Sequence, residues 1–201
     1  MKENIVFKDL FEFIDDDRSH KIAVLDIETT GLKPDNGLIV EIGIVELDLK
    51  TGATKILFES IIKEAGFESY LKNSWIFNNS DLNYEEVIHA PDLVELKEEV
   101  QEILNKYHLT AYNKPFDFSF LESRGFLIKR QLPDIMEAAK NVCKIVKFNG
   151  EYKNPNFQEA WGYFFPESNY IEKHRAVDDA LHEAIVLYEM YQKGNFKVNF
   201  Y

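Results

Sequence analysis

The sequence predicts an α/β protein in which a mixed sheet is flanked by helices. Three apolar, partly alternating segments follow one another at residues 21–28, 37–48 and 53–62, as expected of buried strands. From residue 93 onward the apolar spacing changes to that of helices, apart from a short apolar segment at 109–113. Strands followed mainly by helices in this order are typical of a sheet that carries helices on its faces.

The strands come first and are expected to form an antiparallel meander. Residues 21–28 ("KIAVLDIE") are typical of a buried strand, and residues 37–48 ("GLIVEIGIVELD") of a partly alternating one. The turn signal "LKTG" at residues 49–52 joins this second strand to the third, "ATKILFESII" at 53–62. Tight connections of this kind favour antiparallel pairing of consecutive strands.

The remaining pattern is mostly helical. Apolar residues from Leu93 to Tyr107 recur at helical spacing, and Asp92 is expected in the first turn of that helix. Residues 109–113 ("LTAYN") predict a short strand. A short amphipathic helix is also expected at the N-terminus. The predicted helices other than the one near residue 93 cover residues 5–17, 116–124, 133–146, 156–165 and 176–192.

The composition limits the class of protein. The 201 residues contain no internal repeat and no linker rich in Gly, Ser or Pro, so one domain over residues 1–201 is expected. No window approaches the roughly 20 apolar residues of a membrane span, and the N-terminus carries charges instead of a signal peptide. A single cysteine, Cys143, excludes an internal disulfide framework. These features predict a cytoplasmic protein without a membrane partner.

The charge is unbalanced and segregated along the chain. The net charge of −12, from 35 acidic and 23 basic residues, argues against a broad basic surface for long duplex nucleic acid. It leaves room for a short or single-stranded substrate held at one end by metal ions. Residues 124–153 hold seven basic and three acidic residues, whereas residues 81–102 hold eight acids and one lysine. The basic stretch is either a contact for a phosphate backbone or an ordinary solvated helix face.

Two acids interrupt the apolar run of the first predicted strand. In "VLDIETTGL" (24–32), Asp26 and Glu28 stand where Val or Ile would be expected. Residues i and i+2 of a strand point to the same face, so the two side chains lie next to each other, with Cα atoms about 6–7 Å apart. Burying both carboxylates is costly unless a cation balances them. The pair therefore indicates either a divalent metal site or a solvated strand end with basic partners.

Two further acids stand at predicted helix starts. Asp117 lies in the first turn of the helix that follows "AYN" (111–113), and Asp179 lies one turn inside the last helix, after His174. An acid in a first helical turn is ordinary, because it complements the helix dipole. Taken alone, each of these acids therefore indicates little about function.

Taken together, the three motifs resemble one enzyme family. The motifs D-x-E, N-x-x-F-D and H-x4-D occur in the order found in the DEDD exonuclease superfamily. The histidine and its spacing resemble the DEDDh, or DnaQ-like, branch, since no tyrosine lies four residues before Asp178 or Asp179. The resemblance covers about residues 21–191. The segment "NPNFQEAWGYFFPE" (154–167) is similar to one in RNase T and in the proofreading exonuclease of polymerase III.

This resemblance implies an RNase H-like fold with a mixed five-stranded sheet flanked by helices. It also implies a 3′–5′ exonuclease that releases nucleoside monophosphates from single-stranded DNA or RNA, with two divalent ions about 3.5–4 Å apart. Mg²⁺ is expected, with Mn²⁺ as a substitute, because the four acids offer the oxygen ligands that Mg²⁺ prefers. By analogy with the family, Asp26 bridges the ions, Glu28 and Asp179 hold one of them, and Asp117 helps to hold the other.

His174 is expected to be the general base. An imidazole has an ordinary pKa near 6.5, so it can take a proton from the attacking water at neutral pH. The alternative is a surface or capping histidine. If His174 is the base, the activity is expected to rise with pH through the range of roughly 6–8.

Four more residues are expected to contact the substrate. By analogy with the family, the "TTGL" turn meets the 3′ end through Thr29, and Leu32 packs on the last base, although Leu32 would also suit the core. Asn113 and Phe116 belong to the helix-start motif. Phe116 is expected either to stack on a base or to fill the core.

An aromatic segment lies between the third strand and the long helix. Trp75 and Phe77, in "NSWIFNNSDL" (73–82), occupy the place where proofreading relatives pack a loop and a helix on the terminal bases. They are weaker candidates for base stacking than Phe116, since aromatic residues of this kind are often simply buried.

Three functions are compatible with the sequence. The leading one is an active exonuclease on single strands, and a second is an oligoribonuclease-like enzyme that clears short RNA. The third is a nucleic-acid-binding or polymerase-associated module in which hydrolysis is incidental. The complete set of acids and the histidine favours an active enzyme. RNase T-like members work as dimers, so a homodimer is also expected. Preference for DNA or RNA depends on 2′-OH contacts that the sequence does not place.

Overall fold

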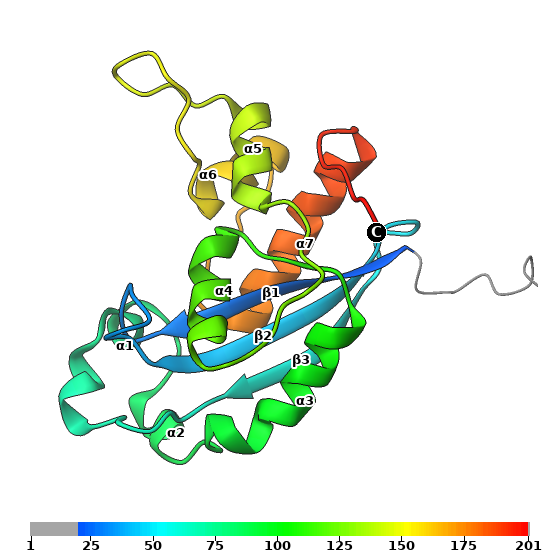
Figure 1. The fold of residues 1–201 in the computed structure, drawn as a ribbon. Helices are drawn as coiled ribbons and strands as arrows, with labels where there is room; N and C mark the ends of the chain where they lie inside the picture. The colour runs from blue at the N-terminus through cyan, green and yellow to red at the C-terminus, as the bar shows by residue number, and fades with distance from the viewer. Residues whose placement is uncertain (1–19, 201) are drawn as a thin grey trace, which may run out of the picture.

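The computed structural model describes residues 20–200, and its centre is a four-stranded sheet with the order β3-β2-β1-β4 (Figure 1). β1 (Lys21–Thr29), β2 (Ile39–Asp48) and β3 (Thr54–Ile61) form the expected antiparallel meander. β4 (Leu109–Thr110) pairs with β1 in parallel on the other side. The predicted helix at residues 5–17 lies outside the described residues.

The prediction of a fifth strand is wrong for the described part of the chain. The segment before Pro133 lies beside β4, but it forms only an isolated bridge between Leu109 and Gln131. Backbone hydrogen bonds of 2.8 Å join Leu109 to Arg130 and to Leu132 on the two sides of this bridge. Pro133 comes next and has no N–H to donate, so the ladder is not extended in this direction.

The helices lie close to their predicted limits, with differences at their ends. α5 (Ile135–Cys143) is shorter than the predicted 133–146 because Lys144 adopts a left-handed conformation, with a φ of 50°, that ends the helix. Asp92 lies just before α3 rather than in its first turn. None of the helices in the described range is long and apolar enough to cross a membrane. The other helical elements are η2 (Ser69–Asn73), α1 (Trp75–Asn79), α2 (Tyr84–Ile88), α3 (Leu93–Lys106), α4 (Lys114–Ser123), α6 (Phe157–Phe164) and α7 (Ala176–Gln192).

The sheet has an apolar core on each face. Alternate residues of β1 point to opposite sides of the sheet. Leu25 and Ile27 lie in a core shared with α3 and α4, whereas Ile22 and Val24 lie in a core shared with α5, α6 and α7 (Figure 1). Each face of the sheet is therefore covered by helices, as the sequence predicted.

The start of α7 lies unusually close to the sheet. A Cβ atom added at Gly43 of β2 would lie 2.4 Å from the carbonyl carbon of Ala176 and 2.4 Å from the nitrogen of Val177. Only glycine leaves room for the backbone of α7 at this distance. Gly43 is paired in register with Asp26 of β1, so this contact with β2 places the first turn of α7 beside the acids of the neighbouring strand.

Candidate active site

The two acids of β1 lie on the face of the strand that α7 covers. The strand register runs without a break from Lys21 to Glu28, so Asp26 and Glu28 follow Ile22 and Val24 on the same side. The prediction that the two carboxylates share one face agrees with this register. The strand thus changes from apolar to acidic along a single face.

One oxygen of the Asp26 carboxylate has no hydrogen-bond partner in the described part of the chain. This atom, Oδ2, is buried. Burial raises the pKa of Asp26 well above its usual range, and the nearby carboxylates of Glu183 and Asp117 raise it further. Burial also raises the pKa of Glu28 well above its usual range, with Asp179 as the strongest charged neighbour. Carboxylates in this state are the groups that a bound cation stabilises.

Asp117 reaches the strand from the side of β4. β4 pairs with β1 only at Ala23 and Val24, so the N–H of Ile27 has no strand partner on that edge. Asp117, in the first turn of α4, fills the gap, because its Oδ1 accepts a hydrogen bond from Ile27 N at 3.2 Å. Asp117 is almost fully buried, and burial raises its pKa well above the usual range. The short β4 is what brings this acid to β1.

Asp179 is held in the first turn of α7. Its Oδ2 accepts a hydrogen bond from Arg175 N at 3.0 Å, and its Oδ1 accepts one from the Tyr170 hydroxyl at 3.1 Å. Burial raises the pKa of Asp179 even though these two bonds act in the opposite direction. The side chain is therefore fixed in place and pointed toward β1.

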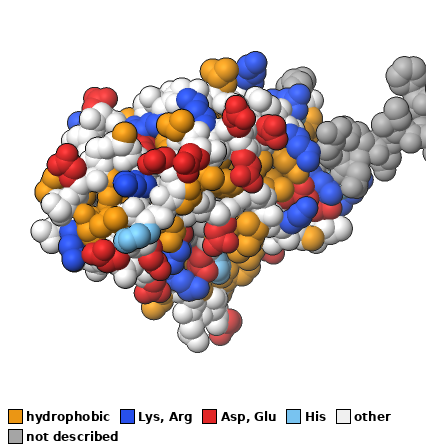
Figure 2. Space-filling view, turned by 90° about the horizontal axis from the view of Figure 1, so that it is seen from below, with side chains coloured by type: hydrophobic (Ala, Val, Ile, Leu, Met, Phe, Trp, Pro, Cys, Tyr) orange, Lys and Arg blue, Asp and Glu red, His pale blue; other side chains and the backbone are white. Residues whose placement is uncertain are grey.

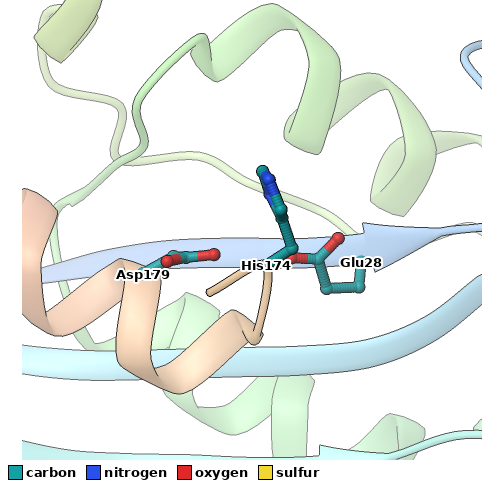
Figure 3. Close-up of side chains that lie close together, drawn as sticks. All are labelled: Glu28, His174 and Asp179. Atoms are coloured by element: carbon teal, nitrogen blue, oxygen red, sulfur yellow. The ribbon is translucent and has the colours of Figure 1, made fainter. Parts of the chain in front are cut away.

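His174 lies between the strand and the helix. Ligand atoms of Glu28, His174 and Asp179 all lie within 4.8 Å of one another. Figure 3 shows Glu28 on β1, Asp179 on α7 and His174 on the loop before α7, with the two carboxylates directed toward the space between strand and helix. The three residues, predicted from separate motifs, are thus brought together.

The backbone and the surroundings of His174 are restrained. The residue has a φ of 54°, a left-handed conformation that is strained for a non-glycine residue and is often found at functional sites. Its ring meets the Trp75 ring edge to face, with centroids 4.8 Å apart. Its Nδ1 lies 3.9 Å from Oε1 of Glu172.

A buried ion pair anchors the segment that carries His174 and Asp179. Glu41 of β2 is 1% exposed, and it accepts hydrogen bonds of 2.7–3.1 Å from the Arg175 guanidinium. The same carboxylate accepts a bond from Ala176 N at 3.1 Å, which satisfies a free N–H at the start of α7. The ion pair and Gly43 together fix where α7 begins.

Sequence reasoning missed two acids at this site. Glu183 lies on α7 one turn after Asp179 and is 4% exposed. Glu172 lies two residues before His174, and burial together with the charge of Asp179 raises its pKa to about 7. The spacing of four between Asp179 and Glu183 was the available signal, because residues i and i+4 share one helix face.

A pocket lies beside Glu28, and it contains most of the predicted substrate residues. Its volume is about 430 Å³, within the range of small-ligand pockets. Leu32 is 86% exposed, so the alternative that it fills the core is wrong. The residues that line the pocket are Ile27, Glu28, Thr29, Thr30, Gly31, Leu32, Trp75 and Phe116.

The remaining aromatic and polar candidates differ in position. Phe116 is partly buried against the Phe120 ring and also lines the pocket, so it contributes to the core while its stacking on a base stays a prediction. Asn113 is exposed at the N-terminus of α4 and does not line this pocket. Phe77 packs against the rings of Phe67 and Tyr84. Of the two aromatic residues in that segment, Trp75 alone lines the pocket.

The basic stretch 124–153 is only partly available to a phosphate backbone. Arg124 is committed to the fold, because its Nε and Nη2 donate to Glu64 at 3.0–3.2 Å and its Nη1 donates to the Pro34 carbonyl. Including Arg124 in the substrate contact was therefore wrong. α5 and the loop that follows it lie at the top of Figure 1, away from the face shown in Figure 2, on which acidic and basic side chains are interspersed.

A comparison with protein families identifies the chain. A family model described as an exonuclease (RNase_T) matches residues 23–187. The chain belongs to this exonuclease family. Members of this exonuclease family generally use divalent metal ions.

Known proteins agree with this assignment. The chain is 29% identical over 182 residues to the DNA polymerase III PolC-type of Caldanaerobacter subterraneus subsp. tengcongensis, an alignment that covers 86% of this chain and 12% of the polymerase. The nuclease domain of 3′hExo, a DEDDh family member bound to rAMP, has a TM-score of 0.64 at 16% identity, covering 90% of this chain and 96% of that chain.

A second solved structure has the same fold. E. coli Exonuclease I in complex with a dA16 oligonucleotide has a TM-score of 0.63 at 12% identity, covering 86% of this chain and 41% of that chain. At these identities the two structures show that the RNase H-like exonuclease fold is shared. The family model and the shared fold thus agree. The PolC-type relative is much longer than this chain, which spans 12% of it.

Proposed function

We propose that this chain hydrolyses phosphodiester bonds from the 3′ end of single-stranded DNA or RNA and releases nucleoside monophosphates. One observation carries the proposal. Four acids from three separated motifs gather around the end of β1, beside a pocket and a restrained histidine, and a buried oxygen of Asp26 has no hydrogen-bond partner in the described chain. The core of this single exonuclease domain would span about residues 21–191.

The donor set fits two divalent cations. Asp26, Glu28, Asp117 and Asp179 offer oxygen ligands, and burial raises the pKa of all four carboxyl groups. Mg²⁺ or Mn²⁺ would be held by these four residues. When bound, the two ions supply stabilisation of the negative charge that develops on the attacking and leaving oxygens.

His174 is proposed to act as the general base. It takes a proton from the attacking water, whose oxygen forms a bond to phosphorus while the bond to the 3′ oxygen of the preceding nucleotide breaks. The leaving oxygen regains a proton from solvent, so a nucleoside 5′-monophosphate and a shortened strand result. Glu172 and Trp75 support this role because they flank the imidazole and limit its orientation.

The pocket beside Glu28 is proposed to hold the terminal nucleotide. Thr29 closes the turn by donating its hydroxyl to the Gly31 carbonyl at 2.8 Å, which shapes one wall of the pocket. Leu32, Trp75 and Phe116 offer apolar and aromatic surface for the terminal base. Asn113 is proposed to contact the substrate from the start of α4, outside this pocket.

The first experiment is a degradation assay. Single-stranded DNA and RNA of the same sequence, labelled at the 5′ end, are incubated with the purified protein and Mg²⁺, Mn²⁺ or EDTA. We expect a ladder that shortens from the 3′ end, is lost with EDTA, and is lost in Asp26→Ala. The faster substrate defines the preference for DNA or RNA. No degradation by the wild type with either metal would refute the proposal.

A polymerase-associated nuclease is a second candidate. The similarity to a PolC-type polymerase favours it, although this chain spans 12% of that relative. A proofreading module is expected to remove a mismatched 3′ terminus from a primed template faster than a matched one, because a frayed end enters the site more readily. Equal rates on both termini would favour a free-strand or oligoribonuclease-like enzyme. The homodimer expected from the RNase T resemblance remains a prediction for sedimentation.

A further inference from the structure

Glu183 is a buried acid to which the four-carboxylate scheme gives no role. It lies on α7 one turn after Asp179, on the helix face that meets β1, and is 4% exposed. An acid this deeply buried is unusual unless it is paired with a base or a metal ion. Its presence therefore requires a physical explanation.

Two other buried glutamates in this fold are paired with arginine. Glu41 accepts hydrogen bonds from Arg175, and Glu64 accepts them from Arg124. Within residues 20–200, by contrast, no Lys or Arg forms an ion pair with Glu183. Its Oε2 accepts a single hydrogen bond of 3.3 Å, from the backbone N–H of Tyr112. The usual explanation for a buried glutamate, a basic partner, does not apply.

The charged groups that face Glu183 are the acids of the active site. Asp117 and Asp179 are its strongest charged neighbours. Glu183 is in turn the strongest charged neighbour of Asp26, ahead of Asp117 and Glu28. The buried Oδ2 of Asp26 has no hydrogen-bond partner in the described chain. An uncompensated oxygen beside a second uncompensated carboxylate is the arrangement that positive charge supplied from outside the chain would balance.

Glu183 also links the elements that carry the other acids. Its hydrogen bond from Tyr112 N joins α7 to the loop before α4. α7 carries Asp179, and α4 carries Asp117. The bond therefore helps to set the distance between two of the proposed metal ligands.

We propose that Glu183 is a fifth carboxylate of the metal centre, a positioning residue that lies behind Asp26 and Asp117 and strengthens the binding of divalent cations through its charge. This inference rests on the proposed two-metal function. The proposed role is electrostatic, since the charge of Glu183 acts on the site through its neighbours Asp26, Asp117 and Asp179.

The test uses a substitution that removes only the charge. Glu183→Gln keeps the length of the side chain and an acceptor for Tyr112 N. Glu189→Gln is the matched control, because Glu189 lies on the same helix and pairs with Lys193 at the surface. Mn²⁺ binding to each protein is measured by titration calorimetry in the absence of nucleic acid. We expect the dissociation constant to rise roughly 10- to 100-fold in Glu183→Gln and to stay unchanged in the control.

A second measurement separates charge from structure. In metal-free buffer we expect Glu183→Gln to melt at a higher temperature than the wild type, because one of several mutually repelling buried carboxylates is gone. Glu183→Leu, which also removes the acceptor for Tyr112 N, is expected to lose this gain. A lower melting temperature for both variants would assign Glu183 a purely structural role and overturn the inference.

The two proposals fail in different ways. Unchanged Mn²⁺ affinity in Glu183→Gln, with normal binding by the wild type, would overturn the fifth-carboxylate inference alone. No Mn²⁺ binding by the wild type would overturn the two-metal function and the inference that rests on it. A dissociation constant that rises in Glu183→Gln but not in Glu189→Gln supports the two-metal function and the fifth-carboxylate inference.

Discussion

The two ends of the contact between β1 and α7 have the same geometry and opposite chemistry. At one end, Ile22 and Val24 of the strand share an apolar core with Leu187 and Met190 of the helix. At the other end, the same strand face continues with Asp26 and Glu28. The same helix face continues there with its own two acids, Asp179 and Glu183.

This difference shows how a fold can hold a costly site. The apolar end stabilises the folded state through the burial of side chains, by about 25 cal/mol per Å² of apolar surface. The acidic end destabilises the folded state until cations bind, because buried carboxylates without partners are poorly solvated and repel one another. The apolar end thus holds the acids at a separation that they would not adopt on their own.

The largest effect is expected from neutralising the acidic end. Asp26→Asn keeps the shape of the side chain but removes the charge shared between the proposed ions. We expect a loss of roughly 10³-fold in the rate of hydrolysis, equivalent to about 4 kcal/mol of transition-state stabilisation. Single-turnover degradation of a labelled strand measures this loss.

The same variant should be more stable than the wild type without metal, because it removes a repelling carboxylate. Its melting temperature in metal-free buffer is therefore expected to rise while its activity is lost. An active Asp26→Asn would contradict the proposed role of Asp26 in holding the metal ions. A variant that melts below the wild type would mean that the acidic end carries no electrostatic strain.

The apolar end should respond in the opposite way. Leu187→Ala opens a cavity in the core between α7 and the sheet, and we expect a loss of roughly 2–5 kcal/mol in the free energy of unfolding. Urea denaturation measures it. Mn²⁺ affinity at low temperature, where the variant remains folded, should stay close to that of the wild type. A large change in affinity would show that the two ends are coupled more tightly than their separation suggests.

His174 tests whether the loop between the two elements contributes chemistry. His174→Gln should lower the rate by roughly 10²-fold, the lower range for loss of a general base. It should also flatten the rise of activity between about pH 6 and 8 that is expected for the wild type. A rise with pH that persists in His174→Gln, measured in the chemical step, would assign the proton transfer to another group.

The stability of the metal-free protein should depend on pH in a direction set by the acidic end. Burial raises the pKa values of Asp26, Glu28, Asp117 and Glu183, so the folded chain binds more protons than the unfolded chain above the ordinary carboxyl pKa. The stability that these groups contribute is then highest below about pH 4.5 and falls as the pH rises through their folded-state pKa values. Glu172, with a pKa of about 7, extends this decline to neutral pH.

Thermal melts between pH 4.5 and 8 test this expectation. The melting temperature should fall with pH in metal-free buffer, by several degrees, and the fall should be smaller with Mg²⁺. A melting temperature that rises with pH in the metal-free protein would contradict it.

The smallest effect is expected far from both ends, on the basic stretch. This stretch contains three exposed lysines, Lys129, Lys144 and Lys147. Replacing all three by Ala should weaken binding of longer oligonucleotides a few-fold. The slope of the logarithm of the binding constant against the logarithm of the salt concentration should fall by less than about three. Dinucleotide hydrolysis should not change. Fluorescence anisotropy at several salt concentrations measures this effect, and an unchanged salt dependence would exclude the stretch from the substrate path.

Local patterns were enough to predict much of the site. The alternation of β1 predicted that Asp26 and Glu28 share a face, and the helix-start positions of Asp117 and Asp179 were also correct. The resemblance to DEDDh exonucleases was needed to bring these motifs together, because nothing local indicates that residues 90 or 150 positions apart meet. The family comparison confirms that resemblance.

The missed features depend on contacts between distant segments. Arg124 looked available in the sequence, but its partner Glu64 lies 60 residues away. The resemblance implied a fifth strand, but the segment beside β4 forms only an isolated bridge, and Pro133 limits further pairing there. Glu183 has no motif of its own, and its burial follows from how closely α7 approaches the sheet. Properties of this kind are set by tertiary packing and cannot be read from periodicity.

Gly43 has a consequence for which substitutions this enzyme tolerates. It has no functional group, yet a single added methyl would act as a wedge under the first turn of α7, where Ala176 and Val177 lie. Such a variant would keep every acid and the histidine and still lack a properly assembled centre. Substitutions at Gly43 are therefore expected to abolish activity as substitutions of the acids do, because the backbone of α7 needs the space that a side chain would occupy.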